Sequence, residues 1–228
     1  MEHKELHFQS SDIVKDIVIG MSDGLTVPFA LAAGLSGAVN NNPIIITAGI
    51  AEIVAGSIAM GLGGYLAGKT EYDHYDAELK REYREVENVP EIEKREIKEI
   101  LKEYSLSEQS QELFINDLSK DKDKWVDFMM KFELGLEKPQ LNRARNSAIT
   151  IALSYIAGGF IPLSPYFFAA SSQSGLVISI AITLISLFVF GFIKSKVIGQ
   201  SPFKGAFKTM LIGTLAAGAA FIIAKSIG

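Results

Sequence analysis

The sequence predicts an all-α membrane protein with five transmembrane helices and a cytosolic helical insertion between spans two and three. Of its 228 residues, 48% are hydrophobic, and the mean hydropathy is positive, +0.24. Several apolar runs approach the roughly 20 residues that a helix needs to cross a bilayer. The charges are unevenly distributed: residues 69–146 hold 20 of the 26 acids and 15 of the 22 basic residues. This charge-dense segment separates two groups of apolar runs.

The apolar runs set the expected organisation of the chain. We expect the spans at about 14–39, 43–68, 147–168, 174–193 and 205–226. The chain then divides into an N-terminal tail with transmembrane helices one and two (1–70), the insertion (71–146), and transmembrane helices three to five (147–228). Because the chain has no cysteine, disulfides and thiolate metal sites are excluded. No basic patch with interleaved aromatic residues indicates a nucleic-acid partner.

The insertion itself reads as helices. Span two is expected to continue without a break through KTEYDHYDAELKREYREVENV until Asn88 and Pro90 interrupt it. Proline is well suited to the first turn of a helix, so PEIEKREIKEILKEYSL should form the next one. Two further helices are expected over SEQSQELFINDLSKD and DKWVDFMMKFELGL. Their apolar residues suffice for a small bundle.

The distribution of lysine and arginine predicts the orientation in the membrane. The loop KSKVIGQSPFK carries four lysines counting Lys208, and Lys138, Arg143 and Arg145 precede span three. The connections at 40–43 and 161–175 carry neither residue type. Positive charge stays on the cytosolic side, so the insertion, the lysine-rich loop and the N-terminus should be cytosolic and the C-terminus on the far side. No targeting motif distinguishes the plasma membrane of a prokaryote from a vacuolar membrane.

Two acids lie inside stretches that otherwise read as membrane. Asp23 falls in the first span and Glu52 in the second, whereas residues 147–228 contain no acid. A carboxylate at bilayer depth is costly and usually marks an ion or proton path. Gly20, Gly24 and Pro28 bracket Asp23, which predicts a helix that is kinked or locally unwound there, with freed carbonyls facing a cavity. A simple kink is the alternative.

The second span contains a methionine whose thioether is a candidate metal ligand. Met60 follows Glu52 by eight residues, which is 80° beyond two turns and about 12 Å along the axis, so the two side chains can line one side of the helix at two depths. Small residues at intervals of four, Ala55, Ala59, Gly63 and Ala67, allow another helix to approach closely.

The insertion contains pairs of carboxylates at helical spacing. Glu82 and Glu85 are three apart, as are Glu93 and Glu96 on the next helix, so each pair can present two carboxylates to one point. Facing pairs across Pro90 could surround divalent metals, with further donors from Met129, Met130 and Glu133. Oxygen and thioether donors together suit ferrous iron better than calcium alone. The alternative is a solvated face in which the acids pair with Lys80, Arg81, Arg84, Lys94 and Arg95.

An enzymatic role has little support. Glu71 and His74 have the spacing of half a di-iron carboxylate site, but such a site needs two of these motifs. The only other histidines are His3 and His7. We therefore expect no ferritin-like oxidase, no other enzyme and no prosthetic group.

Taken together, these residues resemble the vacuolar iron transporter family. The resemblance is carried by SDGLTVPFALAAGLSGA, AEIVAGSIAMGLGGYLAGKTEYDHY and REYREVENVPEIEKREIKEIL. It implies a homodimeric antiporter that exports ferrous iron, and often manganese, from the cytosol in exchange for protons. Zn²⁺ is a further candidate ion. A passive divalent-cation channel and a non-transporting, membrane-anchored metal sensor are the alternatives.

The resemblance also implies roles for individual residues. Asp23, Glu52 and Met60 are similar to the family's transport path between the protomers. The remaining candidates are similar to its cytosolic metal-binding set: Glu82, Glu85, Glu93, Glu96, Met129, Met130 and Glu133. The acids of this insertion are less dense than is typical of the family, because Tyr83, Ile92 and Lys94 intervene among the glutamates.

Overall fold

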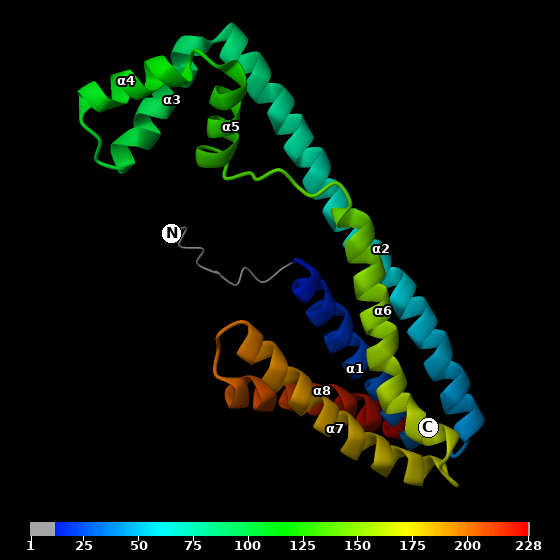
Figure 1. Ribbon diagram of the computed structural model, residues 1–228. Helices are drawn as coiled ribbons and strands as arrows, with labels where there is room; N and C mark the ends of the chain where they lie inside the picture. The colour runs from blue at the N-terminus through cyan, green and yellow to red at the C-terminus, as the bar shows by residue number, and fades with distance from the viewer. Residues whose placement is uncertain (1–11, 228) are drawn as a thin grey trace, which may run out of the picture. The chain divides into compact units, whose positions relative to one another are not determined.

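The computed structural model describes residues 12–227, and its regular secondary structure in that range consists of helices joined by short turns and one longer connection between Phe132 and Arg143 (Figure 1). The predicted cytosolic location of the N-terminal tail concerns residues 1–11, which lie outside the described range. The elements are α1 (Asp12–Ala38), α2 (Asn42–Asn88), α3 (Pro90–Glu103), α4 (Glu108–Leu118), α5 (Lys122–Phe132), α6 (Arg143–Leu163), the 3-10 helix η1 (Ser164–Phe167), α7 (Ser172–Val197) and α8 (Pro202–Ile227).

The predicted all-α architecture with five membrane-length helices is confirmed. Helices α1, α2, α6 with η1, α7 and α8 are each long and apolar enough to cross a bilayer. The predicted continuation of the second span is also confirmed, since α2 runs unbroken over 47 residues to Asn88. Only its apolar part, about residues 43–68, has the composition of a membrane span; beyond Lys69 charged residues are frequent.

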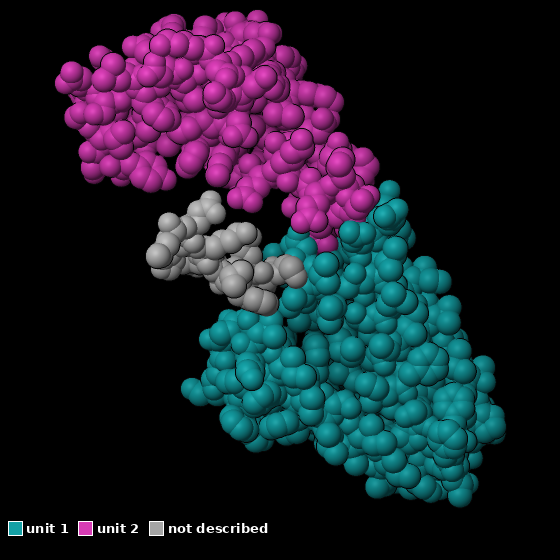
Figure 2. Space-filling model, in the orientation of Figure 1, with its two compact units in different colours: residues 1–66, 144–228 teal, residues 67–143 magenta. Residues whose placement is uncertain are grey.

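Contacts divide the chain into two compact units, and the division falls within α2. One unit comprises residues 67–143, and the other comprises the described residues on either side (Figure 2). In the unit that contains the membrane-length helices, α7 and α8 pack side by side as a hairpin, and both contact α1.

The unwinding expected at Asp23 is wrong: α1 is one unbroken α-helix through this residue. The glycines serve close packing instead. A Cβ on Gly20 would lie 2.8 Å from Cβ of Ser154, and a Cβ on Gly24 would lie 2.9 Å from Cα of Tyr155. Only glycine lets the two backbones approach so closely. Pro28, which lacks an N–H, is accommodated inside the helix and is buried.

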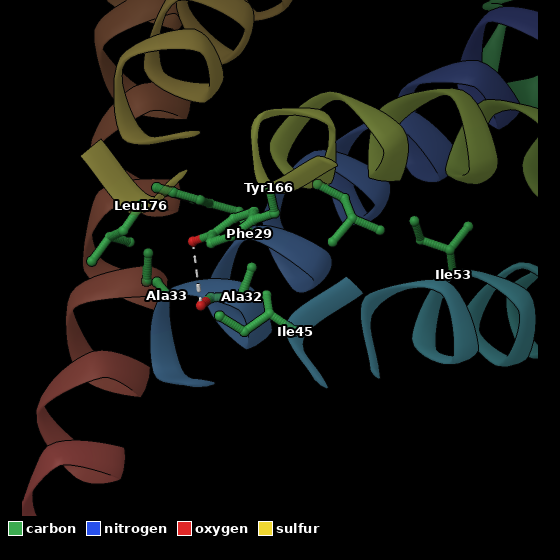
Figure 3. Packing of buried hydrophobic residues seen from close by; sticks show 9 residues of the cluster. Phe29, Ala32, Ala33, Ile45, Ile53, Tyr166 and Leu176 are labelled. Carbon is green, nitrogen blue, oxygen red and sulfur yellow. Dashed lines mark hydrogen bonds between the residues drawn. The ribbon is translucent and has the colours of Figure 1, made fainter. Parts of the chain in front are cut away.

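An apolar core holds the membrane-length helices together (Figure 3). Phe29, Ala32 and Ala33 of α1 pack with side chains from α2, η1 and α7. The core also contains a polar contact: the hydroxyl groups of Ser36 and Tyr166 lie 2.9 Å apart, within hydrogen-bonding distance. The Tyr166 hydroxyl also lies 3.5 Å from the Ala32 carbonyl. A buried tyrosine hydroxyl needs such partners.

The unit of residues 67–143 has a core of its own. Trp125, Val126, Met129 and Met130 of α5 are buried against apolar residues of α2, α3 and α4. The predicted helices of this region are all present, and Pro90 opens α3 as expected. Ser107 caps α4, and Asp121 caps α5 through its side chain.

Substitution of Gly24 should test the close packing of α1 on α6. We expect Gly24→Ala to destabilise the protein by about 1–3 kcal/mol, because the new methyl group meets backbone atoms that cannot yield. Gly218→Ala is the matched control, since a Cβ there has no atom within 4 Å. Thermal unfolding in detergent, followed by circular dichroism at 222 nm, measures the difference. Equal melting temperatures for the two variants would contradict the packing.

Candidate functional site

Asp23 and Glu52 both lie at half-buried positions of the membrane-length helices. Asp23 is placed by α1 and Glu52 by α2, ten residues after that helix begins at Asn42. One carboxylate oxygen of Glu52, Oε2, is buried without a hydrogen-bond partner. A buried polar atom left unsatisfied costs free energy, so its presence in an apolar bundle calls for a proton or a cation as partner.

The sequence analysis missed Tyr155, which donates a hydrogen bond from its hydroxyl group to Oε1 of Glu52. Tyr155 lies on α6 and is 2% exposed. Its ring lies against Gly56 of α2, where a Cβ would come within 2.7 Å of Cε1. Tyr155 is also within electrostatic range of Asp23. The available signal was a tyrosine inside an acid-free span, since a buried phenol requires an acceptor.

Met60 is half-buried on α2. Eight residues of helix separate it from Glu52 by about 12 Å along the axis. Within one chain these two side chains therefore lie at two depths and are too far apart to bind one ion together.

A second group of acids gathers in the unit of residues 67–143. One carboxylate oxygen from each of Glu82, Glu93 and Glu133 lies within 4.8 Å of the other two. These side chains come from α2, α3 and the residue that ends α5. Glu82 and Glu93 are 1% and 3% exposed, and each has an Oε2 atom without a partner. Three convergent carboxylates with free oxygens are suited to a divalent cation.

The solvated-face alternative fails for the two buried acids but fits Glu85. Arg81 donates from Nε to both carboxylate oxygens of Glu85, at 3.2 Å each. Lys80 pairs with Asp76, and Lys94 pairs with Glu91. In the part of the chain that the structure describes, neither lysine has an ion pair with the four predicted glutamates.

Burial, and after it electrostatic repulsion between neighbouring carboxylates, raises the pKa of each member of this group. Burial raises the pKa of Glu82 to about 7, with a further contribution from the charge of Glu133. Burial also raises the pKa of Glu93 to about 7, and Glu96 is the next cause. The pKa of Glu133 is raised by burial and then by Glu96. Glu85 and Glu96 are thus close enough to act on the trio.

Met129 and Met130 are buried in the apolar core of the unit, among residues such as Val86 and Ile97. Met129 is tied to the trio through the backbone, because its carbonyl accepts the N–H of Glu133 at 3.0 Å. Both methionines lie within one helical turn of Glu133 along the chain.

Five membrane-length helices, two of which carry half-buried acids, define a polytopic helical membrane protein. Comparison with known proteins gives its family. The sequence matches the model of the VIT family over residues 14–225. It is 55% identical over 226 residues to "Vacuolar iron transporter 1" of Tulipa gesneriana. The aligned region covers 99% of this chain and 92% of that protein.

Other relatives cover similar lengths. "Vacuolar iron transporter 1" of Arabidopsis thaliana is 53% identical over 223 residues, with 98% of this chain and 89% of that protein covered. "Protein CCC1" of Saccharomyces cerevisiae is 42% identical over 231 residues, with 97% and 71% covered. The chain therefore belongs to the VIT family, and the resemblance noted from the sequence is confirmed.

The raised pKa values make a prediction about stability and pH. The pKa of Glu82 and of Glu93 is higher in the folded protein, about 7, than the ordinary value of 4.5 expected in the unfolded chain. Below pH 4.5 both states are protonated and the stability does not depend on these groups. As the pH rises from 4.5 to about 7 the unfolded chain loses its protons first, so the free energy of unfolding falls. Without metal, the full-length protein should melt several degrees lower at pH 8 than at pH 5.5, at roughly 2–4 °C per kcal/mol for a chain of this length.

The double variant Glu82→Gln, Glu93→Gln should flatten this dependence, because amides do not titrate. Glu99→Gln, an exposed change on α3, is the control. Differential scanning fluorimetry of metal-free protein from pH 5 to 8 measures how the melting temperature depends on pH. A melting temperature that falls equally in wild type and in the double variant would rule out these two groups as the cause.

Proposed function

We propose that this protein is a proton-coupled antiporter that exports Fe²⁺, and also Mn²⁺, from the cytosol across a membrane. Membership of the VIT family and the iron transport named in its relatives support movement of metal ions across a membrane. The observation that carries the proposal is the buried, unpartnered Oε2 atom of Glu52 in an apolar helix bundle. At this depth the carboxylate needs a positive partner, and a proton and a divalent cation are the two that can exchange there.

The cytosolic trio Glu82, Glu93 and Glu133 is proposed to collect the metal. Two of these acids have pKa values near 7, so binding of a cation displaces protons from them. Glu85 and Glu96 add negative charge beside the trio, and Met129 and Met130 are proposed as thioether donors that reach it when metal binds. Mixed carboxylate and thioether ligation accepts Fe²⁺, Mn²⁺ and Zn²⁺.

Asp23, Glu52 and Met60 are proposed to form the path through the membrane. Tyr155 holds one oxygen of Glu52 and leaves the other for the ion. Protons and metal compete for the same carboxylate oxygens, so metal affinity falls as the pH falls. An acidic far side then releases the metal and loads protons, which the return step carries inward.

A homodimer is proposed to complete the path. Ala55, Ala59 and Gly63 form an exposed stripe of small residues along the apolar part of α2. In a bilayer such a stripe permits close packing of a second helix. A second copy placed there would cover the half-buried acids and enclose the path between the protomers.

The proposed orientation places residues 71–146 and the α7–α8 turn in the cytosol and the end of α8 on the far side. Lys194, Lys196, Lys204 and Lys208 lie near that turn, which agrees with the bias of positive charge toward the cytosol. The membrane would be the plasma membrane of a prokaryote or a vacuolar membrane.

Removal of the path carboxylates should abolish transport. Asp23→Ala and Glu52→Ala are each expected to reduce Mn²⁺ or Fe²⁺ flux into proteoliposomes at least a hundredfold, because the ion loses one of the two charged ligands of the proposed path. A fluorescent metal indicator inside the vesicles measures the flux. Glu99→Ala serves as the control, and gel filtration checks that the dimer still forms. Flux at the wild-type rate in either variant would refute the path.

Removal of cytosolic carboxylates should weaken metal capture. Glu82→Ala with Glu85→Ala is expected to lower Mn²⁺ affinity of the full-length protein at least tenfold in titration calorimetry, since one carboxylate of the trio and one neighbouring negative charge are lost. The matched control is Glu99→Ala with Glu103→Ala, two exposed acids on α3. If both double variants bind Mn²⁺ equally well, the trio is not the capture site.

A further inference from the structure

The turn between α7 and α8 carries the densest positive charge among the membrane-length helices. Lys194 and Lys196 lie in the last turn of α7, and Lys204 and Lys208 lie in the first two turns of α8. No acid occurs from residue 147 to 228. Among residues 12–227 none of the four ammonium groups forms an ion pair. The cluster therefore lacks an anion within the described chain.

Close packing of α7 on α8 fixes the backbone positions that carry these lysines. Phe192 meets Phe203 edge to face with ring centroids 5.3 Å apart, and Phe188 meets Phe207 in the same way at 5.4 Å. A Cβ on Gly191 would lie 2.8 Å from Cβ of Thr209, which marks close backbone packing. Pre-organised charges bind an anion at a lower entropic cost than charges on a mobile loop.

The two pairs of lysines differ in their relation to the helix dipoles. Lys194 and Lys196 lie at a helix C-terminus, where positive charge is favourable. Lys204 lies in the first turn of α8, where the dipole disfavours cations and the first N–H groups have no intrahelical acceptor, and Lys208 lies one turn further on. An anion beside the beginning of α8 would satisfy both the lysines and these N–H groups.

Exposed apolar side chains border the cluster and fix the depth at which an anion must lie. Ile193, Val197, Phe203 and Phe207 are all exposed, as expected for side chains that face lipid tails. The ammonium groups thus lie at the boundary between hydrocarbon and water. The phosphate and carboxylate of a lipid headgroup occupy that boundary, whereas a soluble anion must leave bulk water to reach it.

We propose that the α7–α8 turn is a binding surface for anionic phospholipid headgroups, with Lys204 and Lys208 as its principal contacts. Basic residues next to a membrane attract anionic lipids by about fivefold in affinity for each lysine. Its lysines are not among the residues proposed for the path or for metal capture, so lipid binding and metal transport can be tested independently. In the proposed orientation it faces the cytosolic leaflet, where anionic lipids are concentrated.

Titration of the detergent-solubilised full-length protein with a fluorescent short-chain phosphatidylserine tests this surface, with phosphatidylcholine of the same chain length as the reference lipid. Fluorescence anisotropy should show tighter binding of phosphatidylserine. Lys204→Gln with Lys208→Gln should weaken that binding roughly 25-fold, and the charge-preserving pair Lys204→Arg, Lys208→Arg should retain it. Lys225→Gln, at the opposite end of α8, is the control and should have no effect.

Three results would overturn the proposal. Equal affinity for the two lipids would remove the role of headgroup charge. An equal loss with Lys225→Gln and with the double glutamine variant would remove the role of the turn. Displacement of the lipid by millimolar inorganic phosphate would identify the occupant as a soluble anion. Circular dichroism of each variant ensures that folded proteins are compared.

Discussion

The hydrogen bond between Tyr155 and Glu52 is the interaction on which the membrane part of the structure depends. A carboxylate among apolar helices is costly, and this contact stabilises one of its oxygens while the other stays free. The contact requires α6 to lie very close to its neighbours. Gly24 of α1 and Gly56 of α2 provide the space, because a side chain at either position would collide with Tyr155.

The same physical constraint operates outside the membrane, in the unit of residues 67–143. Glu82 and Glu93 are buried beside Glu133, and burial and then repulsion raise their pKa values to about 7. Each of the two sites therefore keeps carboxylate oxygens free and in need of a positive partner. In the proposed antiport, the carboxylates of the insertion capture the metal, and the carboxylate of Glu52 then exchanges it for protons.

Hydropathy and helical spacing were sufficient to predict the five spans, the unbroken α2 and the beginning of α3 at Pro90. They also picked out all three members of the carboxylate trio. They could not predict that Glu82 and Glu93 are buried while Glu85 pairs with Arg81, because this depends on how α2, α3 and α5 pack. The glycines around Asp23 were misread as a helix break for the same reason. Tyr155 was missed because its acceptor lies 103 residues away in the sequence.

Simultaneous measurement of metal and proton movement tests the central claim most directly. Proteoliposomes would carry a Mn²⁺ indicator and a pH indicator inside, with Mn²⁺ added outside. We expect the internal pH to rise as Mn²⁺ enters, at matching rates, and both signals to disappear in Glu52→Gln, since one carboxylate carries both ions in turn. Entry of Mn²⁺ at full rate with no change in internal pH would contradict the account.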